Sequence, residues 1–107
     1  MIMDDLRQRA RAAYDRALAQ KNLKERMSSR MTLAHAGGLW ICDPTLIATL
    51  ESYMHETEIV LLDSQDIPRK IKVDELQYLV KQRHQEIMNE WLMEYAELSK
   101  IRTAKDA

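Results

Sequence analysis

The chain has 107 residues, of which 46% are hydrophobic and 31% are charged, and its formal net charge at pH 7 is −1. This composition is typical of one helix-rich globular domain and excludes an intrinsically disordered chain. Apolar runs contain at most four residues, as at 59–62, far fewer than the roughly 18 residues of a membrane-spanning helix. A single cysteine and the lack of a recognisable secretory signal favour a cytoplasmic location.

Charge is distributed unevenly along the chain. Residues 1–36 contain eight Lys or Arg and four Asp or Glu, a net charge of +4. Residues 37–107 contain eight Lys or Arg and thirteen Asp or Glu, a net charge of −5. We therefore expect the two halves to attract each other, or to attract the opposite halves of neighbouring molecules.

The first 36 residues contain neither proline nor glycine and are rich in Ala, Arg, Leu, Gln and Met. These are good helix formers, so residues 1–36 are predicted to form a basic helical arm, as one helix or as two joined near Asn22. Its apolar stripe is narrow and consists mainly of alanine, which predicts that the first half stands off the domain. Gly37 and Gly38 are expected to end the helix, because glycine adopts the left-handed cap conformation without steric cost.

A strand and a helix are predicted next. Leu39–Cys42 has the composition of a short strand. Asp43 followed by Pro44 is a helix-start signal, because the carboxylate can accept unpaired N–H groups and the fixed φ of proline suits the first helical position. The helix is expected to continue to about His55.

Two runs of strand-forming residues, 59–62 and 67–73, flank the turn-forming residues 63–66, which predicts a β-hairpin. Pro68 lacks an N–H group and should lie at the start of its strand or on an edge. Because a two-stranded hairpin is marginally stable alone, we expect either the strand at 39–42 to join it as a third strand or a helix to cover its apolar face.

Residues 74–107 are predicted to form a long helix, opened by Asp74 with Gln77 as its capping-box partner. Large side chains recur along it at intervals of three and four residues: Leu76, Val80, His84, Ile87, Trp91, Tyr95, Leu98 and Arg102. The pattern repeats every eleven residues, which indicates a nearly straight helix instead of a left-handed coiled coil. The stretch from Asp74 to Arg102 alone, about 28 residues, is roughly 42 Å long as a helix, so part of it should project from a domain of this size.

Together these elements predict a helix-dominated α+β fold in a single domain over residues 1–107. Long N- and C-terminal helices flank a small antiparallel sheet, formed by the β-hairpin and one short strand, with one short helix beside it. The parts are the basic N-terminal helical arm at 1–36, the strand, helix and hairpin at 37–73, and the long C-terminal helix at 74–107.

Two projecting helices and a small core predict that another chain covers some of the apolar surface. Interface centres are enriched in aromatic residues and methionine. The best candidates lie on the last helix: Met88, Trp91, Leu92, Met93, Tyr95 and Leu98. The alternative is that these side chains cover the hairpin and the helix at 44–55 of their own chain.

Basic residues on the first helix form a second candidate surface, for phosphates or for an acidic protein. The leading candidates are Arg7, Arg9, Arg11 and Arg16, and the set continues with Lys21, Lys24, Arg26 and Arg30. The alternative is a solvated helix face whose charge is balanced by neighbouring carboxylates. Only Tyr14 is interleaved among these residues, which argues against stacking on single-stranded nucleic acid.

No catalytic, cofactor-binding or metal-binding site is predicted. The three histidines lack ligand spacing, and no nucleophile elbow, phosphate loop or dinucleotide fingerprint occurs. Asp63 and Asp66 lack the glycine and the further acidic residues of a calcium loop, so they are expected to cap the hairpin turn. Cys42 is expected to be a small buried hydrophobe. We therefore expect no enzymatic activity and no cofactor.

The segment from Gly37 to Arg102 resembles small accessory and structural proteins of large contractile-tailed bacteriophages. The matching features are a Gly-Gly strand before a short helix, a VLLD…P-K/R-x-I/V hairpin, and a long helix ending N-x-W…E-Y-x-x-L-x-K-x-R. The matching residues are Gly37, Gly38, Asp63, Pro68, Asn89, Trp91, Tyr95, Leu98 and Arg102. The resemblance implies a role in virion structure or assembly, in the host cytoplasm or the virion, and it implies no chemistry. The basic helix before Gly37 lies outside the pattern.

We therefore expect a non-enzymatic protein-binding component of a phage assembly that acts through long amphipathic helices. Its expected partners are copies of itself, other phage structural proteins, or both, and no membrane. One alternative is a small regulatory nucleic-acid-binding protein that uses the Arg-rich helix. The other is a phage inhibitor of a host protein.

Overall fold

The computed structural model describes the backbone of residues 2–106 and the side chains of residues 3–100. Its elements, in chain order, are α1 (Ile2–Arg30), β1 (Thr32–His35), β2 (Gly38–Ile41), α2 (Pro44–Ser52), β3 (Glu58–Leu62), β4 (Pro68–Lys72) and α3 (Val73–Asp106). The predicted fold class is confirmed: helices dominate, and the long first and last helices flank small antiparallel strand pairs.

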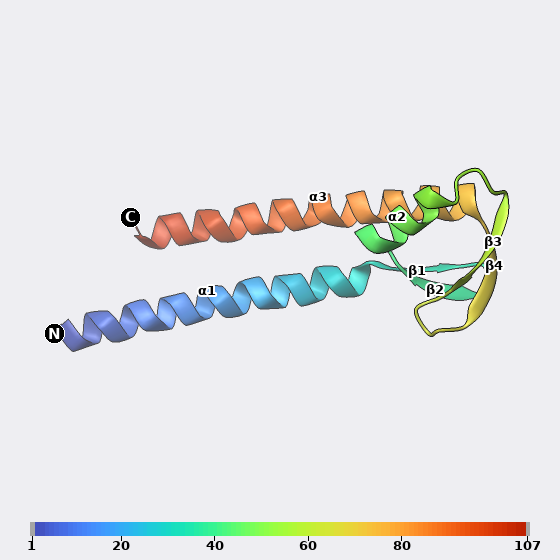
Figure 1. The fold of residues 1–107 in the computed structure, drawn as a ribbon. Helices are drawn as coiled ribbons and strands as arrows, with labels where there is room; N and C mark the ends of the chain where they lie inside the picture. Colours follow the sequence, from blue (N-terminus) through green and yellow to red (C-terminus); the bar gives the residue numbers. More distant parts are fainter. Residues whose placement is uncertain (1, 107) are drawn as a thin grey trace.

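The molecule is a rod of 68 × 23 × 20 Å. Helices α1 and α3 run antiparallel along it, and the strands and α2 gather at one end, far from both termini (Figure 1). We call the end formed by residues 32–82 the head. We call residues 2–31 together with residues 83–106 of α3 the stem.

The first hairpin differs from the sequence prediction. The basic helix ends at Arg30 instead of continuing to residue 36, and Thr32–His35 form a strand that pairs with Gly38–Ile41. Gly37 therefore does not cap a helix but forms the hairpin turn with Ala36, and both residues have a positive φ, of 79° and 51°. A two-residue turn with positive φ at both positions matches the right-handed twist of paired strands.

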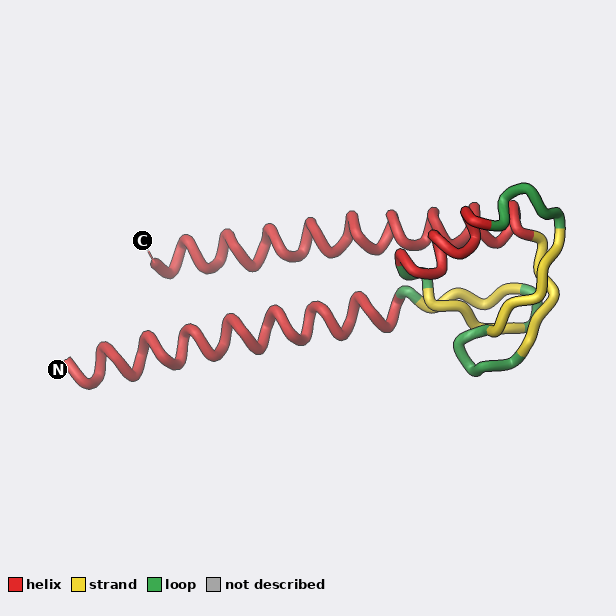
Figure 2. The backbone as a smooth tube through the Cα atoms, viewed as in Figure 1, coloured by secondary structure: helices red, strands yellow, loops and turns green. Residues whose placement is uncertain are grey.

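The second hairpin is confirmed, with Ile59 opposite Ile71 in an antiparallel pair. Pro68 is the first residue of β4, where its missing N–H group costs little. The prediction that the strand at 39–42 extends this sheet was wrong, because β2 pairs with β1 in a separate two-stranded sheet. The two hairpins cross at the end of the head (Figure 2), and the Ser64 N–H group joins them by donating to the Leu39 carbonyl at 2.8 Å.

Helix α2 begins as predicted. The Asp43 carboxylate accepts a hydrogen bond from the Leu46 N–H group at 2.8 Å, and Pro44 occupies the first turn. The helix ends at Ser52, a little before the predicted His55. At the start of α3 the predicted capping box is absent, because the helix begins at Val73, Gln77 is buried, and the Asp74 carboxylate accepts from the N–H group of Glu75.

The hydrophobic core has two parts, and α3 contributes to both. In the head, the buried residues are Trp40, Cys42, Leu50, Ile71, Val73, Leu76 and Val80. In the stem, they are Leu23, Met27, Met31 and Ile87, against which Trp91 and Leu98 pack. The first part of the apolar stripe predicted for the last helix thus packs against α2 and the hairpins, and the later part packs against α1. Cys42 is buried as expected.

Candidate protein-interaction surface

Ion pairs across the stem fix which sides of α1 and α3 face each other. Arg26 binds Glu94 at 2.6 Å, and one turn closer to the head Arg30 binds Glu90. The Arg83 guanidinium donates to the carbonyl of Arg30 at 3.3 Å, at the end of α1 where backbone carbonyls lack helical partners. The expected attraction between the basic first helix and the acidic later part therefore acts within one molecule.

Two of the six predicted interface residues are enclosed by their own chain. Trp91 and Leu98 are half-buried and pack against the stem cluster that includes Leu23 and Met27 of α1. The alternative that these side chains cover part of their own chain holds for these two residues. The element they cover is α1, however, and not the hairpin or α2.

The other four predicted interface residues, Met88, Leu92, Met93 and Tyr95, are exposed, and Leu92 is 69% exposed. Met93 points to a different side of α3 from Leu92, because successive helical residues are about 100° apart. Lys81 marks the side of α3 that carries α2, because its ammonium binds Glu51 of α2 at 2.9 Å. Met88 follows Lys81 by two helical turns, and Leu92 and Tyr95 continue at the next helical spacings. All three therefore lie on the side of α3 that packs against α2, but farther along α3 than α2 extends.

Helix α1 contributes to the same side of the stem. On α3, Met88 directly follows Ile87, which faces α1, and on α1, Lys24 directly follows Leu23, which faces α3. When two antiparallel right-handed helices are viewed from one end, one chain winds clockwise and the other anticlockwise. In each helix, the residue that follows one facing the partner helix is therefore turned toward the same side of the helix pair. Ala17 follows the half-buried Arg16 in the same way.

Helical spacing extends this row to the end of α1, and we call the whole surface the stem face. Its residues on α1 are Leu6, Ala10, Ala13, Ala17, Lys21 and Lys24; those on α3 are Gln85, Met88, Leu92, Tyr95 and Ser99. Leu6 is 59% exposed, and the alanines are exposed too. Figure 1 shows α2 over the head end of α3 and no other element over the stem.

Sequence reasoning missed the α1 half of this surface. The signal was present in the spacing of Leu6, Ala10, Ala13 and Ala17, which recur at four, three and four residues. Because alanines bury little area, this spacing by itself predicts only a weak core stripe. They also permit the close approach of a second helix, however, since their side chains add almost no width.

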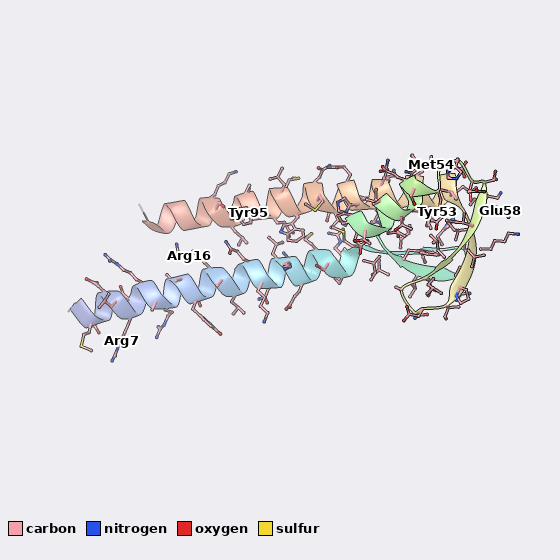
Figure 3. All side chains as sticks on the ribbon, viewed as in Figure 1. Arg7, Arg16, Tyr53, Met54, Glu58 and Tyr95 are labelled. Carbon is pink, nitrogen blue, oxygen red and sulfur yellow. The ribbon has the colours of Figure 1, made fainter. Side chains whose placement is uncertain are left out.

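The four leading arginine candidates do not form one patch. Arg7 and Arg11 are one turn apart on one side of α1, while Arg9 and Arg16 are two turns apart on another. Arg7, Arg9 and Arg11 are exposed, whereas Arg16 is half-buried on the side that faces α3. Figure 3 shows Arg7 near the free end of α1 and Arg16 farther along it, with Tyr95 on the neighbouring part of α3.

Asp63 is the one buried carboxylate among the described side chains, and its contacts explain its place in the hairpin turn. One oxygen accepts from the N–H groups of Gln65 and Ile67 at 2.9 and 3.0 Å, and the other accepts from Arg69 at 3.3 Å. Burial alone would raise the pKa of this carboxyl, but these hydrogen bonds outweigh burial and hold the pKa below its ordinary value. Asp63 therefore has the structural role in the turn that was predicted.

Other groups with chemical potential are also held in structural contacts. His84 Nδ1 lies 2.9 Å from the carbonyl oxygen of Cys42. Burial raises the pKa of the Cys42 thiol, which keeps it protonated at neutral pH. Within residues 3–100, no cluster of three or more His, Cys, Asp or Glu side chains is placed to hold a metal ion. In the described part of the chain, no helix is both long and apolar enough to span a membrane.

Three comparisons with known proteins complete the description of this surface. No family model matches the chain, and no curated protein sequence or solved structure is significantly similar to it. The functional argument therefore depends on the geometry and chemistry of the surface itself.

Proposed function

We propose that this protein is a non-enzymatic, protein-binding component of a larger assembly and that it binds through the stem face. The observation that supports this proposal is the exposure of large apolar side chains in one row. Met88, Leu92 and Tyr95 remain exposed although α1 and α3 already pack against each other. Contiguous apolar surface of this kind marks protein interaction sites in folded proteins.

The shape of the molecule supports the same proposal. The head has its own buried cluster, so the stem beyond it is not needed to enclose the head. The rod is 68 Å long, but its stem encloses a cluster of only four buried residues, so much of the stem surface is open to a partner. A long two-helix stem with an uncovered apolar row suits a subunit that reaches along a neighbouring polypeptide.

A photo-crosslinking residue in place of Leu92 tests this proposal in cells that produce the protein. Met93 is the matched control, because it is the next residue, is equally exposed at 69%, and points to another side of α3. We expect crosslinked products from position 92 and not from position 93. Light scattering of the pure protein then shows whether the partner is a second copy. Equal crosslinking at both positions, or none at either, would contradict the proposal.

We further propose that the assembly belongs to a contractile-tailed phage. The support for this step is the resemblance of residues 37–102 to phage accessory proteins, including Trp91 and Leu98 on α3. Both residues pack on α1 and hold the stem together, so the motif coincides with a structural feature of the stem. Finding the protein or its crosslinked partner in purified phage particles is the test.

The second candidate function is nucleic-acid binding by α1. The observation in its favour is that Arg26 and Arg30 pair with carboxylates, whereas no ion pair engages Arg7, Arg9 or Arg11 within residues 3–100. Gel shift at two salt concentrations tests it, because binding to phosphates weakens steeply with salt. Simultaneous change of the three free arginines to glutamine should abolish any such binding.

A further inference from the structure

We infer that the partner seated on the stem face is an amphipathic helix with acidic flanks, supplied by another protein. This inference rests on the proposed function and names the chemistry of the partner. Two features of the described chain support it: a helix already occupies the head end of this same side of α3, and the charges along the uncovered part are all positive.

Helix α2 shows in the same molecule how the surface accepts a helix. It covers α3 with Leu50 fully buried and with Leu46 and Ile47 half-buried. At its edge, the Glu51 carboxylate binds the Lys81 ammonium at 2.9 Å. The internal example therefore combines an apolar face with a carboxylate that meets a lysine of α3. A partner helix placed end to end with α2 would meet the same kind of surface.

The charges of the stem face favour a carboxylate-bearing partner. The charged residues on it are Lys21 and Lys24, and neither Asp nor Glu occurs among its residues. Neither lysine forms an ion pair within the described side chains. The carboxylates of α3 that face α1, Glu90 and Glu94, are engaged by Arg30 and Arg26. Acidic flanks on an incoming helix would complement the free lysines.

A second copy of this chain suits the stem face less well. Two stems packed by this face would bring Lys21 and Lys24 of both copies into one interface without a carboxylate from either stem face. Like charges placed together oppose association. In addition, α2 of each copy stands above the stem face at the head end, which restricts how far two stems can overlap.

Two designed helical peptides test the inference. Each has about 18 residues, roughly 27 Å of helix, which is long enough to extend from the end of α2 along Leu92 and Tyr95 to Lys24 and Lys21, given the Arg26–Glu94 and Arg30–Glu90 pairing of the two helices. Both carry the same leucine and alanine face; one has glutamates at the flanking positions and its twin has lysines. Fluorescence anisotropy of the labelled peptides with the full chain gives the affinities. We expect the acidic peptide to bind at least about tenfold more tightly, with a preference that shrinks as salt is added.

Variants of the full chain locate the binding site. Leu92→Glu should weaken binding of the acidic peptide about tenfold or more, while Met93→Glu should leave it unchanged. The double variant Lys21→Glu, Lys24→Glu should reverse the preference, so that the lysine peptide binds more tightly. Circular dichroism verifies that each variant keeps its helices, which is expected because all four residues are exposed.

Three results would overturn the inference. One is equal or tighter binding of the lysine peptide by the unmodified chain, and another is no binding of either peptide. The third is a concentration-dependent dimer that Leu92→Glu dissociates, which would assign the stem face to a second copy. Crosslinking tests the proposed function separately from these results. If crosslinked products form from position 92 and not from position 93, the proposed function stands even when the inference about the acidic helix fails.

Discussion

Gly38 lies directly against the carboxylate of Asp63: a Cβ atom on Gly38 would stand 2.8 Å from Asp63 Oδ2 and 3.2 Å from Asp63 Cβ. The two residues belong to different hairpins, one to the start of β2 and the other to the turn after β3. The absence of a side chain at Gly38 therefore allows the second hairpin to pack against the first.

The first prediction is that Gly38→Ala destabilises the head. Asp63 cannot move away easily, because hydrogen bonds from Gln65, Ile67 and Arg69 hold its carboxylate. We expect a loss of about 2 kcal/mol or more in the free energy of unfolding, the usual size for overpacking at a buried contact. Urea denaturation followed by circular dichroism measures it. A variant as stable as the unmodified chain would show that the hairpins are not tightly packed.

The second prediction concerns pH. The pKa of Asp63 in the folded chain lies below its ordinary value of 3.8, so the unfolded chain binds this proton more readily. The carboxylate therefore contributes its full stabilisation above the ordinary pKa and loses it as the pH falls through 3.8 toward the folded value. Asp63→Asn should reduce stability at pH 7 and make the acid limb of the stability curve shallower. Parallel acid limbs for the two proteins would contradict this account.

The third prediction is a stabilising substitution at the first turn. Ala36 has a φ of 51°, a left-handed conformation that costs a residue with a Cβ atom about 1 kcal/mol. Ala36→Asn creates Asn-Gly, the sequence favoured in two-residue hairpin turns. Because the Asn side chain offsets the cost of its Cβ atom by local hydrogen bonds, the change should raise the free energy of unfolding, by at most about 1 kcal/mol. Gly37→Ala, with a φ of 79° at the next position, should lower it by a similar amount. Thermal melts of both variants measure the two changes in stability. A change of the same sign in both variants would contradict the prediction.

The fourth prediction separates the stem from the head. Ile87 is buried between α1 and α3, so Ile87→Ala should weaken their packing by about 3 kcal/mol. Because the head has its own cluster, amide hydrogen exchange should accelerate in residues 19–30 much more than around Leu76 and Val80. Met93→Ala, a truncation of an exposed side chain, is the control and should change neither region. Equal acceleration in both regions would mean that head and stem unfold together.

Local sequence signals were sufficient for the elements whose stabilising contacts are close in the chain. Asp43 and Pro44 start α2 because the cap acts on an N–H group three residues away. The β3–β4 hairpin was predictable because turn formers, among them the capping Asp63, separate two strand-forming runs. The eleven-residue repeat from Leu76 to Ile87 and Leu98 also identified correctly the side of α3 that packs inward.

Tertiary contacts decided the rest. Thr32–His35 follow a long helix without a break in composition, and they form a strand because Leu33 pairs with Trp40 across the Ala36–Gly37 turn. Periodicity shows which residues share one side of a helix, but not which element or chain covers that side. Only the antiparallel pairing of α1 with α3 enclosed Trp91 and left Leu92 exposed, because a rotation of one residue separates a buried position from an open one.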